Sequence, residues 1–416
     1  MKRSSQRDSI EVVLDADFLA SPTLVGTLFR ASGHGNEVFS FRYHPDWLRN
    51  SSAVAIDPQL MLADGEFYPD QGSGAFRAFM DSAPDRWGRV LLDRREVLRA
   101  KDENRPVRAL TEWDYLLGVH DSCRLGALRF RRGEDSGFLD ADNGFTIPPL
   151  STLRELEAAA KALEDPRASD QPSYRKWLAT ILEPGSSLGG ARPKANFLDV
   201  DGSLWIAKFP SRNDRHDVAA WEKVLHTLAQ RSGIVVPQAR LLPGKEHHTF
   251  ACQRFDRVGD RRRFFVSAMT LLGKNDGQKA SYLDLAEFIS RNVGPKSDDL
   301  RQLWTRMVFN ILVGNRDDHL RNHGFILSRN VWRLAPAYDV NPTGEKAGHA
   351  LMIDAHDNKG DIELALKTAN YYGLSNPMAQ ELLTKIRDSV SGWRAAAEQL
   401  GIPRSEIEHM SAAFQA

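Results

Sequence analysis

Hydrophobic and polar positions follow different patterns along the chain. Between residues 9 and 68, short apolar runs such as 24–29 and 38–41 are separated by Gly, Pro, Asn and Asp, a pattern typical of short strands. Helical spacing follows around 86–98 and 112–119. A further helix is expected from Ser151, which is suited to cap it. The pattern predicts a β-rich opening region followed by a few helices.

A hairpin is predicted in the middle of the chain. Apolar runs at 197–200 and 203–209 flank the dipeptide Asp201-Gly202, which accepts the positive φ angles of a tight turn. Lys208 is therefore expected on a strand.

Apolar residues then recur at helical spacing over 213–229, and Glu222 falls in the middle of this predicted helix. Two further strands are expected at 235–242 and 248–255. Together these elements predict a sheet with one helix.

The pattern turns helical towards the end of the chain. Ser297 is suited to cap a helix that ends at Gly314, a residue type favoured just after a helix. The tail over 377–400 has a similar apolar stripe, and between these helices the runs 325–327 and 331–334 indicate another hairpin.

We therefore expect an α+β protein with a β-rich N-terminal part and a mainly helical C-terminal lobe. The expected divisions are a β-rich subdomain over 1–105, a lobe that carries a phosphate-binding loop over 106–275, and a helical lobe over 276–416.

Composition narrows the functional classes. Lys plus Arg equals Asp plus Glu at 55 each, so net charge gives no argument for binding nucleic acid or an anionic membrane. Two cysteines, Cys123 and Cys252, cannot make a disulfide framework in a chain this long. No apolar run approaches the length that spans a bilayer, and no secretory signal follows the basic start. A cytoplasmic location is expected.

The strongest chemical signal lies on either side of the second hairpin. Asp317 precedes Asn322 by five positions, and Asp339 follows one hairpin later. Because a hairpin returns the chain to its start, these three side chains are able to converge. The set provides a carboxylate to accept a hydroxyl proton and oxygen ligands for magnesium, as phosphoryl transfer requires. An acidic loop that merely caps a helix is the alternative interpretation.

A glycine-containing loop precedes the first hairpin. Gly189 and Gly190 lie five and four residues before Lys194, and glycines of this kind let backbone N–H groups approach phosphate oxygens. A simple turn would show the same pair. Lys208 on the next strand is then placed to contact phosphates, with Glu222 as a possible orienting partner.

Together these features resemble the HipA toxin kinases, which are Ser/Thr protein kinases of type II toxin–antitoxin systems. The segments that carry the resemblance are 186–194, the Lys208 strand, 253–257, the Asp317 loop and 335–342. The resemblance extends over essentially the whole chain. It implies a two-lobed protein-kinase-like fold.

The resemblance also implies roles for individual residues. Asp317 would be the catalytic base, with Asn322 and Asp339 as Mg²⁺ ligands. His319 lies between Asp317 and Asn322, and its position favours orienting the loop through hydrogen bonds over acting as a metal ligand or base. ATP would be bound by the set Ser187, Gly189, Gly190, Lys194, Lys208, Gln253 and Phe255. Ser187 would be autophosphorylated, although Ser186 beside it is a second acceptor, and Gln253 stands where a Glu is common.

The partners implied by the resemblance are a helix-turn-helix antitoxin, DNA through the antitoxin complex, and a protein of translation such as an aminoacyl-tRNA synthetase. Growth arrest would follow. Two other functions fit the same motif: a small-molecule phosphotransferase of the antibiotic type, and a non-catalytic pseudokinase that acts as a corepressor.

Overall fold

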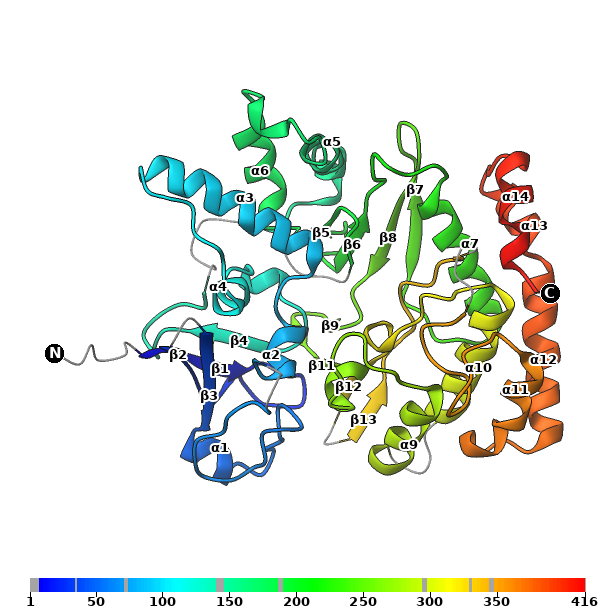
Figure 1. Ribbon diagram of the computed structural model, residues 1–416, viewed down its shortest axis with the longest axis horizontal. Helices are drawn as coiled ribbons and strands as arrows, with labels where there is room; N and C mark the ends of the chain where they lie inside the picture. The colour runs from blue at the N-terminus through cyan, green and yellow to red at the C-terminus, as the bar shows by residue number, and fades with distance from the viewer. Residues whose placement is uncertain are drawn as a thin grey trace. The chain divides into compact units, whose positions relative to one another are not determined.

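The computed structural model describes residues 7–33, 36–70, 74–139, 146–185, 190–293, 298–328, 331–343 and 348–415. The chain forms two compact units (Figure 1). The first unit comprises Met1–Ala207, Asp256–Val266 and Ser328–Asn330, and the second comprises Lys208–Phe255, Ser267–Leu327 and Val331–Ala416. The three-part division expected from the sequence stays a prediction.

The first unit begins with an antiparallel sheet in the strand order β3-β2-β1-β4. β1 pairs with β2 with a register shift between Val12 and Val13, as at a β-bulge. On its buried side, the ring of Phe79 lies 5.7 Å from that of Phe41 and 6.1 Å from that of Phe130. These aromatic side chains join the sheet to the short helix that carries Phe79. The elements of the sheet and this helix are β1 (Arg7–Leu14), β2 (Thr23–Gly33), β3 (Asn36–Tyr43), β4 (Leu128–Arg131) and α2 (Arg77–Asp81).

The remaining elements of the first unit are mainly helical. β5 and β6 form the hairpin expected around Gly202, whose φ of 78° fits the tight turn. The short strands β9 and β10 pair with each other. These elements are α1 (Pro45–Arg49), α3 (Arg86–Asp102), α4 (Glu112–Leu117), α5 (Leu153–Leu163), α6 (Tyr174–Leu182), β5 (Lys194–Leu198), β6 (Leu204–Lys208), β9 (Arg257–Val258), β10 (Arg261–Arg262) and β11 (Phe264–Ser267), the last of which ends in the second unit.

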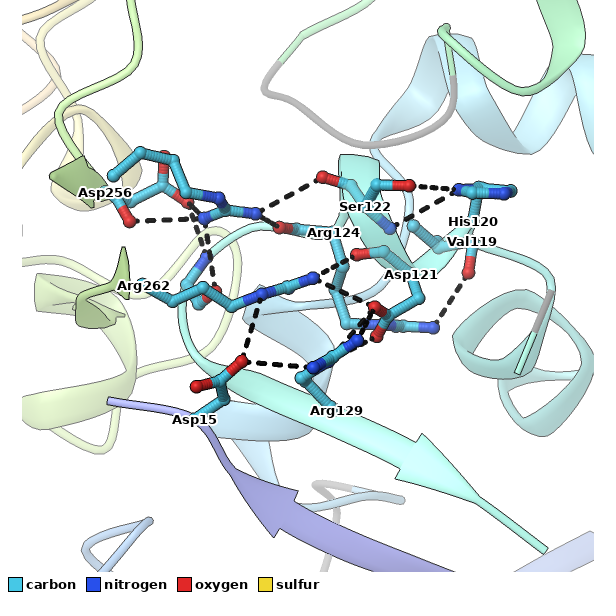
Figure 2. Close-up of polar contacts among 11 residues, drawn as sticks. Asp15, Val119, His120, Asp121, Ser122, Arg124, Arg129, Asp256 and Arg262 are labelled. Atoms are coloured by element: carbon cyan, nitrogen blue, oxygen red, sulfur yellow. Dashed lines mark hydrogen bonds and ion pairs between the residues drawn. The ribbon is translucent and has the colours of Figure 1, made fainter. Parts of the chain in front are cut away.

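A buried group of charged side chains fastens the segment that begins at Asp256 to the rest of the first unit (Figure 2). Asp121 accepts hydrogen bonds from Arg129 and, at 2.9 Å, from Arg262. Arg129 also reaches Asp15 at 3.1 Å. Burial raises the pKa of Asp121, but the neighbouring arginines lower it more, so the carboxyl stays ionised.

The second unit is largely helical and has one extensive hydrophobic core. Its central helix α10 carries Trp304, Met307 and Ile311, which are fully buried, and packs against α9 and α12. Gly314 ends α10 with a φ of 64°, and a Cβ there would lie 2.3 Å from the carbonyl oxygen of Ala413. Glycine is required by both the backbone angle and the close approach.

The helices of the second unit are α7 (Val218–Arg231), α8 (Ala268–Leu271), α9 (Tyr282–Asn292), α10 (Asp299–Leu312), α11 (Ile362–Lys367), α12 (Asn376–Ser391), α13 (Trp393–Gln399) and α14 (Arg404–Met410). Its strands are β7 (Ala239–Leu242), β8 (Thr249–Gln253), β12 (Gly324–Ser328, whose last residue counts with the first unit) and β13 (Val331–Leu334). β7 pairs with β8, and β12 with β13. Within the described ranges, no helix combines the length and apolar character that crossing a bilayer requires.

The α+β class and the change from strands to helices are confirmed, but several predicted boundaries were wrong. Ser151 lies in a 3₁₀ turn, and α5 begins after Thr152. The helix expected from 213 starts at Val218, because the Asp217 side chain caps it by accepting from a backbone N–H. The tail expected as one helix divides at Gly392. Ser297, the predicted cap of α10, lies outside the described residues.

Candidate active site

Lys208, the last residue of β6, is held between two carboxylates in the second unit. Its Nζ atom donates to Glu222 Oε1 at 2.6 Å and to Asp339 Oδ1 at 2.8 Å. The Glu222 side chain, on α7, is only 6% exposed, whereas that of Asp339 is 39% exposed. Glu222 therefore holds the lysine on its buried side, and on its other side the lysine contacts the more accessible carboxylate of Asp339.

The charges of this group stabilise one another. Burial lowers the pKa of Lys208, but the carboxylates of Asp339 and Glu222 raise it more, so its net shift is upward and the ammonium stays charged. Burial also raises the pKa of the nearby Cys252 to about 12. Cys252 is therefore a protonated, unreactive thiol near neutral pH.

The loop that follows α10 presents Asp317. Its side chain is exposed, while its backbone carbonyl accepts a hydrogen bond from Asn322 Nδ2 at 3.2 Å. The backbone N–H of Asn322 in turn donates to the carbonyl of His319 at 2.8 Å. These bonds close the loop on itself, and Asp317 is exposed to solvent.

Several bonds hold this loop against the segment that carries Asp339. Tyr338 Oη donates to the carbonyl of Arg321 at 2.7 Å, next to Asn322 in sequence. Arg316 N donates to Thr343 Oγ1 at 2.8 Å. The neighbours of Asp317 and Asn322 thus bond to residues on both sides of Asp339, and the β12–β13 hairpin brings the two segments together.

Asp339 has an unusual backbone conformation. Its φ is 57°, and Asn104 is the other non-glycine residue with a positive φ in the described ranges. This left-handed region is tolerated by Asp better than by most residues, but it still costs free energy. The surrounding contacts therefore hold Asp339 in a conformation that directs its carboxylate to Lys208.

Asp318 was missed by the sequence interpretation. It is buried and accepts hydrogen bonds from the Tyr282 hydroxyl, from Asn310 Nδ2 at 2.9 Å and from His323 Nε2 at 2.8 Å. Burial raises its pKa, but His323 and Tyr282 lower it more. Asp318 anchors the loop to the protein interior, whereas Asp317 is exposed. The Asp-Asp doublet was the available signal, but nothing in it indicated which carboxylate is buried.

The two histidines of the loop differ in the same way. The side chain of His319, to which orientation of the loop was assigned, is exposed. His323 is 2% exposed and bonds to Asp318. The geometry therefore assigns the contact with the buried carboxylate to His323.

Two residues expected to bind ATP, Gln253 and Phe255, lie at the end of β8 and just beyond it. The backbone N–H of Gln253 donates to the carbonyl of Gln238 at 2.9 Å. The ring of Phe255 stacks on that of Tyr338, with centroids 5.4 Å apart and an interplanar angle of 26°. Through Tyr338, Phe255 is linked to the segment that carries Asp339.

The predicted phosphate-loop residues belong to the first unit. Ser186, Ser187 and Gly189 lie outside the described residues. Gly190 has a φ of 101°, which favours glycine. Lys194 is 2% exposed, and its Nζ donates to Asp85 Oδ2 at 2.6 Å.

The second unit offers oxygen atoms to a divalent cation. In the ranges that the structure describes, no group of three His, Cys, Asp or Glu side chains is arranged to hold a metal ion. However, Asp339 already bonds a cationic ammonium through one carboxylate oxygen. Asn322 bonds Asp317 through its amide nitrogen, so its carbonyl oxygen is not used in that bond. Carboxylate and amide oxygens are ligands that suit Mg²⁺.

Two family models match the chain. The model of the HipA-like C-terminal domain matches residues 186–408, and the model of the HipA N-terminal domain matches residues 16–112. The first match covers more than half of the chain and includes Lys208, Asp317 and Asp339. The chain belongs to the HipA family.

Curated proteins that match this HipA-family chain are described as kinases. It is 28% identical over 197 residues to a Haemophilus influenzae protein named "Putative kinase", covering 41% of this chain and 57% of that protein. It is 24% identical over 267 residues to the "Serine/threonine-protein kinase toxin HipA" of Shewanella oneidensis, covering 55% of this chain and 59% of that protein. The matched part of the chain thus spans under two thirds of the length of these relatives.

A solved structure shows the same fold. It is the complex of HipA, HipB and operator DNA from Shewanella oneidensis, with a TM-score of 0.61, 16% identity, and coverage of 97% of this chain and 94% of that chain. At this identity the likeness establishes the HipA fold and nothing finer.

Proposed function

We propose that this chain is an ATP- and magnesium-dependent Ser/Thr protein kinase of the HipA toxin type. The observation that carries the proposal is the position of Lys208 between Glu222 and Asp339. A lysine held by a buried glutamate and facing an aspartate near an exposed Asp317 loop is the arrangement that protein kinases use. The descriptions of the relatives as kinases support the same class.

Each residue has a distinct role in this proposal. The exposed carboxylate of Asp317 would accept the proton of the attacking hydroxyl and orient that hydroxyl. Lys208, kept charged by its two carboxylates, would bind phosphate oxygens of ATP, while Glu222 keeps it in place. Asn322 and Asp339 would hold Mg²⁺, which neutralises phosphate charge when it is bound.

The nucleotide base would lie near the end of β8. The backbone around Gln253 and the ring of Phe255 provide polar and apolar surface for adenine, and Tyr338 holds Phe255 by stacking. Gly190 and Lys194 are the described members of the proposed phosphate loop. The proposed autophosphorylation site is Ser187, or Ser186 beside it.

The biological role is proposed from the relatives. One is named a kinase toxin, and the solved complex contains HipB and operator DNA. For this chain we propose growth arrest through phosphorylation of a translation protein, such as an aminoacyl-tRNA synthetase. A helix-turn-helix antitoxin would neutralise it, and contact with DNA would come through that antitoxin.

The test is incubation of the purified chain with γ-labelled ATP and Mg²⁺, with no small molecule added. The kinase proposal predicts label on the chain itself, mapped by mass spectrometry to Ser186 or Ser187, and its loss when EDTA removes Mg²⁺. Label that appears only on an added small molecule would indicate the antibiotic-type phosphotransferase. Nucleotide binding with no transfer by unphosphorylated protein would indicate the pseudokinase.

A further inference from the structure

Lys194 is buried in the first unit and bonds to the carboxylate of Asp85, which lies 109 positions earlier in the chain. The side chains of Lys194 and Asp85 are 2% and 7% exposed, and their charged atoms are 2.6 Å apart. The Lys194 ammonium also donates to the carbonyl oxygen of Gly190 at 3.1 Å. Its charge is thus directed to Asp85 and to the backbone at Gly190.

Asp85 uses both of its carboxylate oxygens. Oδ1 accepts the backbone N–H of Gly88 at 2.7 Å and so caps the start of α3, while Oδ2 accepts from Lys194. Trp87, in the first turn of α3, donates its backbone N–H to the same Gly190 carbonyl at 3.3 Å. The beginning of α3 therefore holds Gly190 directly through Trp87 and indirectly through Lys194.

The other side of the 186–189 segment is held in a similar way. Asn196, two residues beyond Lys194 on β5, donates to the carbonyl of Pro184 from its backbone N–H at 2.7 Å and from its side chain at 2.8 Å. A Cβ at Gly185 would lie 2.9 Å from Leu91 Cδ1 on α3. Residues on both sides of this segment are thus fixed by α3 and β5.

From this geometry we infer that Asp85 is a positioning residue for the phosphate loop, and that Lys194 is its partner rather than a ligand of ATP. The inference rests on the proposed kinase function. Moving the Lys194 ammonium to a phosphate would leave the Asp85 carboxylate buried and unpaired, which is strongly unfavourable. The pair instead sets the position of Gly190, whose backbone belongs to the proposed phosphate loop.

The inference is tested by a double-mutant cycle with Asp85→Asn and Lys194→Met. Asn keeps an oxygen to cap α3 and removes only the charge that faces Lys194. We expect each variant to raise the KM for ATP about tenfold with a smaller change in kcat, and the double variant to be no worse than either. Asp85→Glu, which keeps the charge, should recover part of the loss.

If Lys194 bound ATP directly, Lys194→Met would be far more impaired than Asp85→Asn, and the two effects would add. That result overturns the inference. The matched control is Asp102→Asn at the other end of α3, where Asp102 pairs with Arg175 with side chains 54% and 53% exposed. Such an exposed pair contributes little to stability, so the KM of Asp102→Asn for ATP should stay at the wild-type value.

A measurement on the wild-type chain covers the case in which a variant does not fold. Lys194 should resist acetylation by an amine-reactive reagent equally with and without ATP, as read by peptide mass spectrometry, because Asp85 seals it. Labelling in the free protein that ATP prevents would contradict the inference. Failure of the kinase proposal is seen separately, as no phosphate transfer by the wild-type chain, and it leaves the labelling result of Lys194 unaffected.

Discussion

Two lysines are the first and last residues in sequence of one hairpin, Lys194 at the start of β5 and Lys208 at the end of β6, and they lie in contrasting surroundings. Lys194 and its partner Asp85 are both almost fully buried. Lys208 is 14% exposed, and one of its partners, Asp339, is 39% exposed. A lysine closed on every side by protein serves the fold, whereas one that faces an accessible carboxylate is able to meet a ligand. The residue type alone does not distinguish the two.

Lys194→Met should have the largest effect on stability. The substitution leaves Asp85 buried without a counter-charge, and breaking such a pair costs about 3–5 kcal/mol. Urea unfolding should show this loss of free energy of unfolding, with no comparable loss for Lys176→Met, which replaces an exposed lysine of α6 in the same unit. Equal stability of Lys194→Met and Lys176→Met would show that the buried pair of Lys194 and Asp85 does not stabilise the fold.

Lys208→Met should slow phosphate transfer, and it should also cost stability because it leaves the buried Glu222 carboxylate without a counter-charge. Loss of its charge removes the proposed contact with ATP phosphates, and the rate should fall about a hundredfold. Lys367→Met, at the exposed end of α11, is the control and should transfer phosphate at the wild-type rate. A Lys208→Met variant with full activity would mean that this lysine does not contact ATP during phosphate transfer.

Asp318→Asn tests the same difference between buried and exposed charges in two neighbouring carboxylates, those of Asp318 and Asp317. The Asn carbonyl oxygen can still accept from Tyr282, Asn310 and His323, but the negative charge that strengthens these bonds is lost. We therefore expect a loss of about 2 kcal/mol in the free energy of unfolding. The measurement is a urea titration of the variant beside Asp317→Asn, whose exposed site should leave stability within about 0.5 kcal/mol of wild type. Equal losses would show that Asp318 does not anchor the loop.

Much of this arrangement could be predicted from local sequence. The Asp201-Gly202 turn placed Lys208 on a strand, and the spacing of Asp317 and Asn322 indicated one loop. The Lys194–Asp85 pair could not be found in this way, since its members are 109 positions apart and neither has a periodic signature. The same holds for Asp318, whose burial depends on contacts from distant helices.

The smallest expected effect concerns an ion pair of intermediate exposure in the first unit. Burial raises the pKa of Asp114, but hydrogen bonds from Arg108 and Thr111 lower it to about 2. A depressed carboxyl pKa stabilises the fold above the unfolded value of about 3.9, and this contribution is lost as the pH falls towards about 2.

Because the Arg108 side chain is 52% exposed, solvent screening reduces the contribution to about 1 kcal/mol. In urea titrations, Asp114→Asn should therefore be less stable than wild type at neutral pH and nearly equal to it near the folded pKa. A difference that persists at the acidic pH would mean that the charge of Asp114 is not its source.

The central claim is that Asp317 is the base of a phosphoryl-transfer site, and phosphate incorporation into Asp317→Asn tests it most directly. Wild type, Asp317→Asn and the exposed control Asp388→Asn on α12 would be incubated with Mg²⁺ and ATP and followed by intact mass. The account predicts that Asp317→Asn is slower by about a thousandfold while Asp388→Asn matches wild type. Undiminished incorporation in Asp317→Asn would contradict it.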